Sequence, residues 1–546
     1  MIRYGRPIST LIAILFPIII YLFYTIHNSV NLFYADDYHL LKTVLWIREV
    51  EGVLATIQML ISQHNEHRIL VPRLLTILDY QIEGQINWKS LILIGNLIWI
   101  GNLWFFWEGF RHFKIPYWMF VAIPFIFLQP QYSDNVTWAI SILQQSVIVF
   151  LYSLLTYLCS KNKYYWALLV AVLATFTHGN GIFSFIIGIA IALMDQKRRT
   201  ALIWFLTWLV IGFIYFWHFV KGQNADFGRS FSDPARLIMS FFAFFGSMTK
   251  VRFDSGYAAV VWGMIMVLIL GFYLVPKLKM YIVTAGYRLT SFDKMLFGNV
   301  LFLGITAGLV SISRSWGGIE AMLAARYQHY SPYLLCWVYI VILVSLNLRN
   351  RKIAAVSFIC FAILFNGLSY FRYNMDVQYH KSWLLADESN WKNHNVMLNY
   401  VTSINHNIKD TYKQVVAAGI CKSESNFKPV GAFDSLLVSG HNLVFSNQLY
   451  ASNAATGVDQ LNYQIVTNDM LTGSTFLYLS TDDGVGYWLP TRREHSGIRE
   501  FFRTGKFSKP GFKADFLTEN FPSGVYRVGL LNNDVFNWTL KTISIP

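Results

Sequence analysis

The chain has 546 residues, of which 55% are hydrophobic, 17% aromatic and only 14% charged, and its mean hydropathy is +0.40. Soluble globular proteins carry about 25% charged residues, so this composition excludes a water-soluble chain, a disordered chain and a coiled coil. The net charge of +14 does not indicate a nucleic-acid-binding protein, because most lysines and arginines stand in short clusters between apolar runs. The composition predicts a polytopic membrane protein.

The N-terminus carries Arg3 and Arg6 before a long apolar stretch that lacks a small-residue cleavage site. We therefore expect an uncleaved first transmembrane helix. Runs of about 20 mostly apolar residues predict eleven spans. They lie near 8–28, 89–110, 115–132, 136–158, 163–178, 181–195, 200–219, 256–276, 293–312, 329–348 and 353–371.

The basic clusters between these spans assign the two sides of the membrane. They are Arg3/Arg6, Arg111/Lys114, Lys161/Lys163, Lys197–Arg199, Lys277/Lys279/Arg288 and Arg349/Arg351/Lys352. With eleven spans all six fall on one side, which the positive-inside rule makes cytoplasmic. The fold class expected is an α-helical membrane domain, residues 1–372, followed by an extracytoplasmic domain, residues 373–546.

Two regions outside the spans have structure of their own. In the loop 29–88, apolar residues recur at helical spacing around 40–47 and 69–78, which predicts amphipathic interfacial helices. The tail opens with a helix near 390–418 and continues with the strand-like runs STFLYLS, GVYRVGLL and NWTLKTISI. We expect an α+β domain that is mainly β.

The four cysteines show neither CxxC spacing nor a histidine partner at metal-binding spacing, so they predict no disulfide framework and no structural zinc. They are Cys159, Cys336, Cys360 and Cys421.

Polar residues near the ends of spans are costly enough to indicate function. Asp36 and Asp37 follow the first span, and adjacent carboxylates near a low-dielectric surface suit a general base or a cation ligand. Acidic residues also favour a solvated helix N-terminus, and the dipeptide alone does not choose between these readings.

The segment QHNEHRILVPR gathers His64, Glu66, His67, Arg68 and Arg73. A helix here puts both histidines on one face, which makes a metal possible in principle. A charged helix end facing a polar substrate is the stronger interpretation, and interfacial snorkelling is the alternative for Arg73.

Three further groups of polar residues lie on the predicted outer side of the membrane, as the first two groups do. Amides and an indole, which suit sugar hydroxyls and rings, occur in QPQYSDNVTW, whereas THGNGIF suits either a ligand or a chain reversal. Two arginines in SRSWGGIEAMLAARYQHYSP run against the positive-inside bias and indicate an anion site. The candidate residues are Gln131, Asp134, Asn135, Trp138, His178, Asn180, Arg314, Arg326 and Tyr327.

This layout resembles the GT-C superfamily of membrane glycosyltransferases, through the acidic pair in a long first outer loop, the many spans and the extracytoplasmic tail. More narrowly, it resembles the bacterial and phage serotype-converting O-antigen glucosyltransferases. The elements NEHRxxxPR, QxxDNVxW, HGNG and ARYxxYSP are similar to patterns in related bacterial membrane proteins. The resemblance places the chain in a bacterial inner membrane, with its tail in the periplasm.

The resemblance implies a polyprenyl-phosphate-linked sugar, such as glucose, as donor and a lipid-linked glycan such as O-antigen as acceptor. Asp36 or Asp37 is then the catalytic base, with Glu66 and His67 orienting the acceptor or the base. Arg326, Arg314, Arg68 and Tyr327 bind the lipid phosphate, and the amide, indole and histidine residues of the other two groups bind sugar. A monophosphate donor implies no metal or other cofactor.

Two other classes compete with this interpretation. A lipid-linked oligosaccharide flippase or transporter predicts internal repeats and polar residues at the bilayer midplane, and the sequence shows neither. An O-antigen polymerase also transfers glycosyl groups, but the tail of about 170 residues argues against it.

Overall fold

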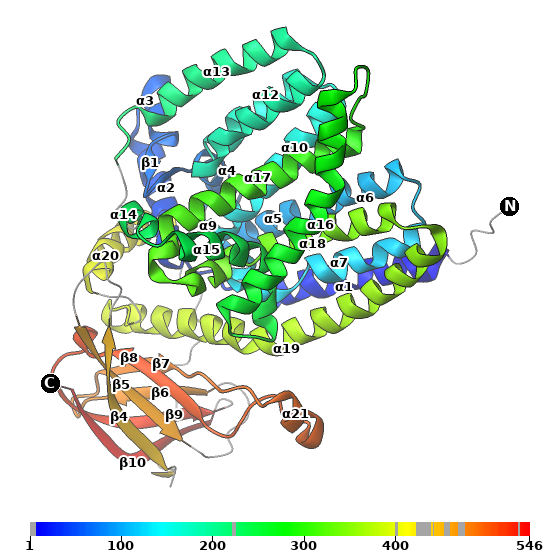
Figure 1. Cartoon of the computed structure of the whole chain (residues 1–546). Coiled ribbons are helices and arrows are strands. Elements are labelled where there is room, and N and C mark those ends of the chain that lie inside the picture. Colours follow the sequence, from blue (N-terminus) through cyan, green and yellow to red (C-terminus); the bar gives the residue numbers. More distant parts are fainter. Residues whose placement is uncertain are drawn as a thin grey trace. The chain divides into compact units, whose positions relative to one another are not determined.

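The computed structural model of the chain describes residues 7–220, 225–398, 402–421, 438–439, 442–451, 459–467, 475–532 and 535–545. These residues are mainly helical, with a sheet region toward the C-terminus (Figure 1). Their contacts define two compact units. The first comprises residues 1–27, 46–79 and 90–370, and the second comprises residues 28–45, 80–89 and 371–546. The predicted domain boundary at residue 372 stays a prediction.

The helices are short in several places where the sequence is continuously apolar. In chain order the α-helices are α1 (Pro7–Asn28), α2 (Tyr38–Glu49), α3 (Val53–Leu60), α4 (Leu70–Glu83), α5 (Trp88–Ile100), α6 (Leu103–His112), α7 (Ala122–Phe127), α8 (Ser133–Thr137), α9 (Ala139–Ser141), α10 (Val147–Ser160), α11 (Tyr164–Thr175), α12 (Ser184–Met194), α13 (Arg198–Phe216), α14 (Phe227–Phe231), α15 (Pro234–Gly246), α16 (Gly256–Val283), α17 (Ser291–Arg314), α18 (Tyr330–Ser345), α19 (Leu348–His394), α20 (Thr402–Ala417) and α21 (Ile498–Thr504). The 3₁₀ and π segments used below are η1 (Ala35–Asp37), η2 (Tyr117–Val121), η3 (Pro130–Tyr132), η4 (Ile142–Ser146), η5 (Gly179–Phe183) and η9 (Ala325–Tyr327).

Seven helices among the described residues are long and apolar enough to cross a membrane. They are Ile8–Asn28, Trp88–His112, Ala139–Ser160, Arg198–Phe216, Gly256–Val283, Ser291–Gly317 and Leu348–His394, each of which overlaps a predicted span. The predicted spans 163–178 and 181–195 correspond to two shorter apolar helices, Tyr164–Thr175 and Gly179–Met194. The count of eleven and the assignment of sides therefore stay predictions.

The predicted span 115–132 is not one helix. Its helical part, η2 followed by α7, runs only from Tyr117 to Phe127 before the chain becomes extended at Leu128. A bilayer core needs about 20 helical residues, and residues 115–132 form no single helix of that length, so the segment is not among the seven candidate spans. The sequence carries Pro116, Pro124 and Pro130, and the last two interrupt the backbone hydrogen bonding that a longer helix needs.

One apolar helix, α15, was missing from the predicted spans. It packs against α16 so closely that a side chain at Gly246 meets the carbonyl of Ala259, and one at Gly263 meets that of Phe242. Small residues at such a crossing let two backbones approach, which is how apolar helices gain packing energy without a hydrophobic driving force. With 13 residues, α15 is shorter than a span.

The C-terminal region forms two sheets, as its strand-like sequence predicted. The strands are β3 (Val438–Ser439), β4 (Leu443–Ala451), β5 (Asp459–Thr467), β6 (Thr475–Ser480), β7 (Gly486–Pro490), β8 (Phe512–Leu517), β9 (Gly524–Asn532) and β10 (Val535–Ile545). One sheet has the order β3-β10-β9-β6-β7 and the other β4-β5-β8. Among the described strands of these sheets, β3 and β10 pair in parallel and the other pairs are antiparallel. The three predicted strands are confirmed as β6, β9 and β10.

The amphipathic segments predicted in the loop 29–88 are confirmed as helices α2 and α4. Leu40, Leu41 and Val44 are buried on one face of α2, which explains their spacing. The predicted tail helix is divided between the end of α19 and α20, with residues 399–401 outside the described part of the chain.

Candidate functional site

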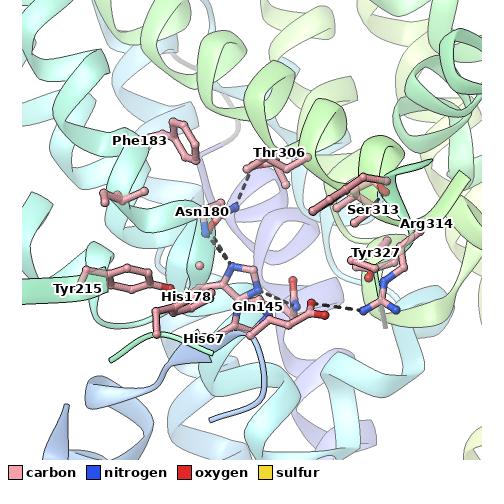
Figure 2. A pocket seen from close by; sticks show the side chains of 18 of the residues that line it. His67, Gln145, His178, Asn180, Phe183, Tyr215, Thr306, Ser313, Arg314 and Tyr327 are labelled. Carbon is pink, nitrogen blue, oxygen red and sulfur yellow. Dashed lines mark hydrogen bonds and ion pairs between the residues drawn. The ribbon is translucent and has the colours of Figure 1, made fainter. Parts of the chain in front are cut away.

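A cavity of about 370 Å³ lies within the first unit (Figure 2). Its lining combines polar side chains on one part of the wall with aromatic and aliphatic side chains on the other. The polar residues and glycine are Glu66, His67, Gln145, His178, Gly179, Asn180, Thr306, Ser313 and Arg314. The remainder are Ile182, Phe183, Tyr215, Phe216, Phe219, Ala225, Phe227, Leu309, Val310, Tyr327 and Tyr330.

The cavity lies at one particular end of the helices that line it. It contacts Gln145, just before α10 begins, and Arg314, the last residue of α17. The predicted cytoplasmic residues Lys161 and Arg288 lie beyond the opposite ends of these two helices. The positive-inside rule therefore predicts that the cavity opens on the outer side.

Glu66 and His67 belong to a hairpin in which a two-residue turn joins two short strands. The interpretation of this segment as a helix is therefore wrong. Strands β1 (Gln63–His64) and β2 (His67–Arg68) pair with His64 opposite His67. Asn65 takes a φ of 47° at the turn, a left-handed conformation that asparagine adopts more readily than most residues. No group of three or more metal-ligating side chains occurs within the described residues.

The hairpin holds the C-terminal end of α13 over the cavity. Arg68 donates hydrogen bonds to the carbonyls of Tyr215 and Trp217, both at 2.7 Å, and to that of Ile61. Gln63 exchanges two hydrogen bonds with the backbone of Val220. A helix leaves its last four carbonyls without intrahelical partners, and a guanidinium satisfies several of them at once. Arg68 thus serves as a helix cap rather than lining the cavity.

Two uncharged histidines, His67 and His178, line the polar part of the cavity. The rings of His67 and His178 stack with centroids 4.3 Å apart and an interplanar angle of 29°. Burial, and then the neighbouring His178, lowers the pKa of His67 well below its ordinary value. Burial also lowers the pKa of His178 to about 4. Both rings are therefore uncharged at neutral pH, and they present hydrogen-bonding edges rather than positive charge.

A chain of hydrogen bonds fixes the orientation of His178 (Figure 2). Its Nδ1 lies 2.8 Å from Asn180 Oδ1, which only accepts, and 3.4 Å from the backbone nitrogen of Asn180; we assign the proton to Nδ1 because the contact with Oδ1 is the shorter one. Its Nε2 then accepts from the amide of Gln145 at 3.1 Å. Asn180 in turn donates to Thr306 at 2.9 Å. Gln145 belongs to η4, a π-helical turn, a rare geometry that recurs at functional sites.

The charged groups of the cavity are Glu66 and Arg314. A guanidinium nitrogen of Arg314 lies 3.7 Å from Glu66 Oε2, and the two side chains are 25% and 22% exposed. This separation exceeds the 2.7–2.9 Å typical of a charge-assisted hydrogen bond, so these two atoms form an ion pair without a close hydrogen bond. The other oxygen, Glu66 Oε1, is buried without a hydrogen-bond partner among the described residues, which suits a ligand hydroxyl.

An apolar groove adjoins the cavity along α13. It has a volume of about 570 Å³ and shares Ile182 and Phe216 with the cavity. Its other residues are Trp208, Leu209, Gly212, Phe213, Trp217 and His218. Leu209, Phe213 and Trp217 are exposed on a helix apolar enough to span a membrane, so this groove faces the hydrocarbon if α13 does span.

The neutral state of His178 predicts an acid-sensitive fold. Its pKa of about 4 lies below the value near 6.5 of an unfolded chain, so between these values the unfolded chain binds more protons. The free energy of unfolding therefore falls as the pH drops from 6.5 to 4. We expect the thermal midpoint in detergent to fall over this range, and to fall less in His178→Gln. An equal fall in both proteins contradicts the assignment.

The position of His67 depends on the absence of a side chain at residue 179. A Cβ at Gly179 lies only 2.5 Å from His67 Nδ1, so Gly179→Ala pushes the buried ring off His178. Overpacking of this kind costs about 1–3 kcal/mol. Equilibrium unfolding followed by tryptophan fluorescence measures this cost. Gly308→Ala is the matched control, since no atom lies within 4 Å of its Cβ position, and it should not destabilise the protein. Equal stability of the two variants refutes this packing account.

Several predicted site residues lie outside the cavity and support it. Asn135 donates to the carbonyl of Arg326 at 3.1 Å and contacts His329 Nδ1 at 2.8 Å. Gln131 donates to the carbonyl of Ser247, and Trp138 lies between α8 and α9. These contacts fix η9, the turn that carries Arg326 and the cavity residue Tyr327.

Arg326 and Asp134 interact electrostatically with each other, and neither residue lines the cavity. The guanidinium of Arg326 lies 5.1 Å from the ring centroid of Tyr327, and Arg326 does not line the cavity. Burial raises the pKa of Asp134, and the nearby positive charge of Arg326 opposes that rise. The cavity therefore favours Arg314 over Arg326 as the anion-binding arginine, the reverse of the order that the sequence suggested.

The acidic pair of the loop 29–88 belongs to the second unit. Asp37 is 1% exposed and accepts a hydrogen bond from the backbone N–H of Tyr34 at 3.0 Å, closing η1. Asp36 is partly exposed, and Ala35 before it has a φ of 44°, a strained value for a residue with a side chain. Between the two, Asp36 is the better candidate for chemistry.

Five polar residues of the cavity were not predicted: Ser313 and Tyr330 flank predicted site residues in SRSWGGIEAMLAARYQHYSP, and the other three lie inside predicted spans. The five residues are Gln145, Tyr215, Thr306, Ser313 and Tyr330. The available signal was weak: polar side chains inside predicted spans are costly and tend to be functional.

Comparison with known proteins finds no match for this chain among protein-family models, curated protein sequences or solved structures. Its function is therefore argued from the cavity and the sequence.

Proposed function

We propose that the chain is a membrane glycosyltransferase of the GT-C type, which moves a sugar from a polyprenyl-phosphate donor to a lipid-linked glycan. The observation that carries this proposal is the junction of two surfaces in the first unit. A polar cavity with one arginine adjoins an apolar groove along α13, and the two share Ile182 and Phe216. A ligand that fits both has an anionic, hydroxyl-rich head and a hydrocarbon chain.

The cavity suits the head of such a lipid in size and chemistry. Its volume of about 370 Å³ falls in the range of about 300–1,000 Å³ typical of small-molecule sites. Glu66, Gln145 and Asn180 offer acceptors and donors for sugar hydroxyls, while Phe183 and Tyr215 offer ring faces (Figure 2). Such a mixture of few polar groups and aromatic walls orients a sugar and excludes bulk water.

Arg314 has the role that the reaction depends on most in this proposal. As the bond between the anomeric carbon and the phosphate oxygen breaks, the sugar becomes oxocarbenium-like and the lipid phosphate gains negative charge. A guanidinium already aimed at that oxygen stabilises this charge more in the transition state than in the bound donor. Because the guanidinium supplies the positive charge, the proposed reaction needs no metal or other cofactor.

The acceptor hydroxyl needs a base, and we assign this role to Asp36. The assignment rests on the resemblance of the first outer loop to GT-C enzymes and on the exposure of Asp36 relative to Asp37. Its carboxylate removes the proton as the acceptor oxygen attacks the anomeric carbon opposite the departing phosphate. Glu66 and His67, which line the cavity, hold the donor sugar in position.

The proposal includes a cellular setting. Its reaction takes place at the outer face of a bacterial inner membrane, with the N-terminus cytoplasmic and the C-terminal region periplasmic. A donor such as polyprenyl-phosphate-glucose and an acceptor such as lipid-linked O-antigen fit the resemblance to serotype-converting glucosyltransferases.

Sugar transfer by the purified protein tests the proposal. Polyprenyl-phosphate-glucose serves as donor and a lipopolysaccharide extract as acceptor, with and without EDTA. Transfer that persists in EDTA supports a metal-independent glycosyltransferase. Donor binding without transfer to any glycan tried favours a lipid-linked oligosaccharide flippase instead, and absence of donor binding removes both.

A further inference from the structure

The C-terminal region carries an exposed apolar and basic surface around α21. We call residues 498–507, which comprise α21 and the turn after it, the α21 tip. Phe502 is 82% exposed and Phe507 57% exposed, and Ile498 is exposed one helical turn before Phe502. Figure 1 shows α21 at the end of an excursion away from the strands of its own unit. Large aromatic side chains on a projection of this kind indicate a contact surface.

Positive charge surrounds these aromatic residues. The segment 492–513 contains seven basic and two acidic residues, a net charge of +5. Glu494 is already paired with Lys513 and Lys509. In contrast, Arg499, Arg503 and Lys506 are exposed and form no ion pair with another described residue. Three unpaired cations beside exposed phenylalanines complement a surface that is apolar within and anionic at its boundary.

Aromatic packing ties the tip to the end of an apolar helix. The rings of Phe501 and Phe507 lie 5.2 and 5.8 Å from that of Phe371, and 4.6 Å from each other. Phe371 belongs to α19, a candidate membrane span, and it is the last residue of the apolar run 353–371. If this run spans the hydrocarbon, Phe371 lies where the helix leaves it, the level at which membrane proteins concentrate aromatic residues.

We propose that the α21 tip is a membrane-interface anchor that binds anionic phospholipid of the outer leaflet. Ile498, Phe502 and Phe507 enter the boundary between headgroups and acyl chains, while Arg499, Arg503 and Lys506 contact lipid phosphates. This anchoring does not depend on the proposed sugar transfer. A protein partner and a glycan are the other possible occupants, and the aromatic contact with the end of the α19 apolar run favours lipid over both.

The test uses the full chain in nanodiscs of phosphatidylglycerol and phosphatidylethanolamine. The three buried cysteines stay, and Cys360, which is exposed, is replaced by serine. A nitroxide spin label is attached at Phe502→Cys, and a matched label at Leu540→Cys on β10, whose side chain is 79% exposed. Electron paramagnetic resonance then compares the access of oxygen, which partitions into lipid, with that of a water-soluble nickel complex.

We expect the label at 502 to meet oxygen more readily than nickel, and the label at 540 to meet nickel more readily. Replacing phosphatidylglycerol by phosphatidylcholine, or combining Arg499→Gln, Arg503→Gln and Lys506→Gln, should shift label 502 toward water. These substitutions are on the surface and spare the fold. Equal, water-like access at 502 and 540 overturns the proposal. Shielding of label 502 from both reagents overturns it as well and indicates a protein or glycan contact.

Discussion

Arg314→Ala is expected to lower kcat of sugar transfer by about 100- to 1,000-fold, the loss typical of removing one preorganised donor to a developing negative charge. Arg314 lines the cavity, where its guanidinium lies 3.7 Å from the carboxylate of Glu66. Initial rates with saturating polyprenyl-phosphate-sugar measure the loss. Arg314→Lys should recover part of the rate, because an ammonium keeps the charge but lacks the planar pair of donors.

Two matched arginines make this result specific. Arg252 is exposed and does not line the cavity, so Arg252→Ala should leave kcat unchanged. Arg326→Ala removes a guanidinium that lies against Tyr327 without lining the cavity. We expect kcat to fall by less than about tenfold, because this change shifts a neighbour of the site and removes no hydrogen-bond donor to the phosphate. A larger loss in Arg326→Ala than in Arg314→Ala contradicts the assignment of the phosphate to Arg314.

Asp36→Asn is expected to reduce kcat by about 100- to 10,000-fold, the usual contribution of a general base, while donor affinity stays within threefold. Asparagine matches the shape of aspartate but does not accept the acceptor's proton. Asp37→Asn is the internal control. Asp37 closes η1 by accepting from Tyr34 N–H, and an asparagine oxygen accepts that bond equally well.

The two substitutions separate the roles of neighbouring carboxylates. Transfer rates and donor binding are measured on both variants, with circular dichroism as the check on folding. An Asp36→Asn enzyme that retains full activity refutes the base assignment. A large loss in Asp37→Asn alone moves the role to Asp37.

Hydropathy and residue period predicted much of the fold. All seven long apolar helices overlap predicted spans, because burial in hydrocarbon requires a continuous apolar run that is visible in the sequence. The strands β6, β9 and β10 were visible for a similar reason. The region 115–132 does not form the one continuous helix that was predicted, since hydropathy measures polarity and the prolines that interrupt the helix hardly change it.

The candidate site was predicted only in part. His178, Asn180, Glu66, His67, Arg314 and Tyr327 were identified from local clusters of polar residues, and all six line one cavity. Arg68 was taken as a phosphate ligand, but its guanidinium is used by carbonyls of Ile61, Tyr215 and Trp217. The partner of a long side chain is set by tertiary structure, and two of these carbonyls are almost 150 residues away in the sequence.

Tertiary structure also explains why some residues of the cavity were not predicted. Gln145 and Thr306 lie inside predicted spans, and only the π-helical turn η4 and the packing of α17 bring them to His178 and Asn180. Arg314→Ala and Asp36→Asn test the phosphate and the base assignments independently, since the two residues belong to different units.

Photo-crosslinking of the donor lipid tests the central claim most directly. A polyprenyl-phosphate-glucose analogue with a diazirine near the phosphate end of its chain is irradiated with the protein, and labelled peptides are mapped by mass spectrometry. We predict labelling of residues 208–218 of the α13 groove, suppressed by excess unlabelled donor and reduced in Arg314→Ala. Labelling that avoids this groove, or that unlabelled donor does not suppress, contradicts the account.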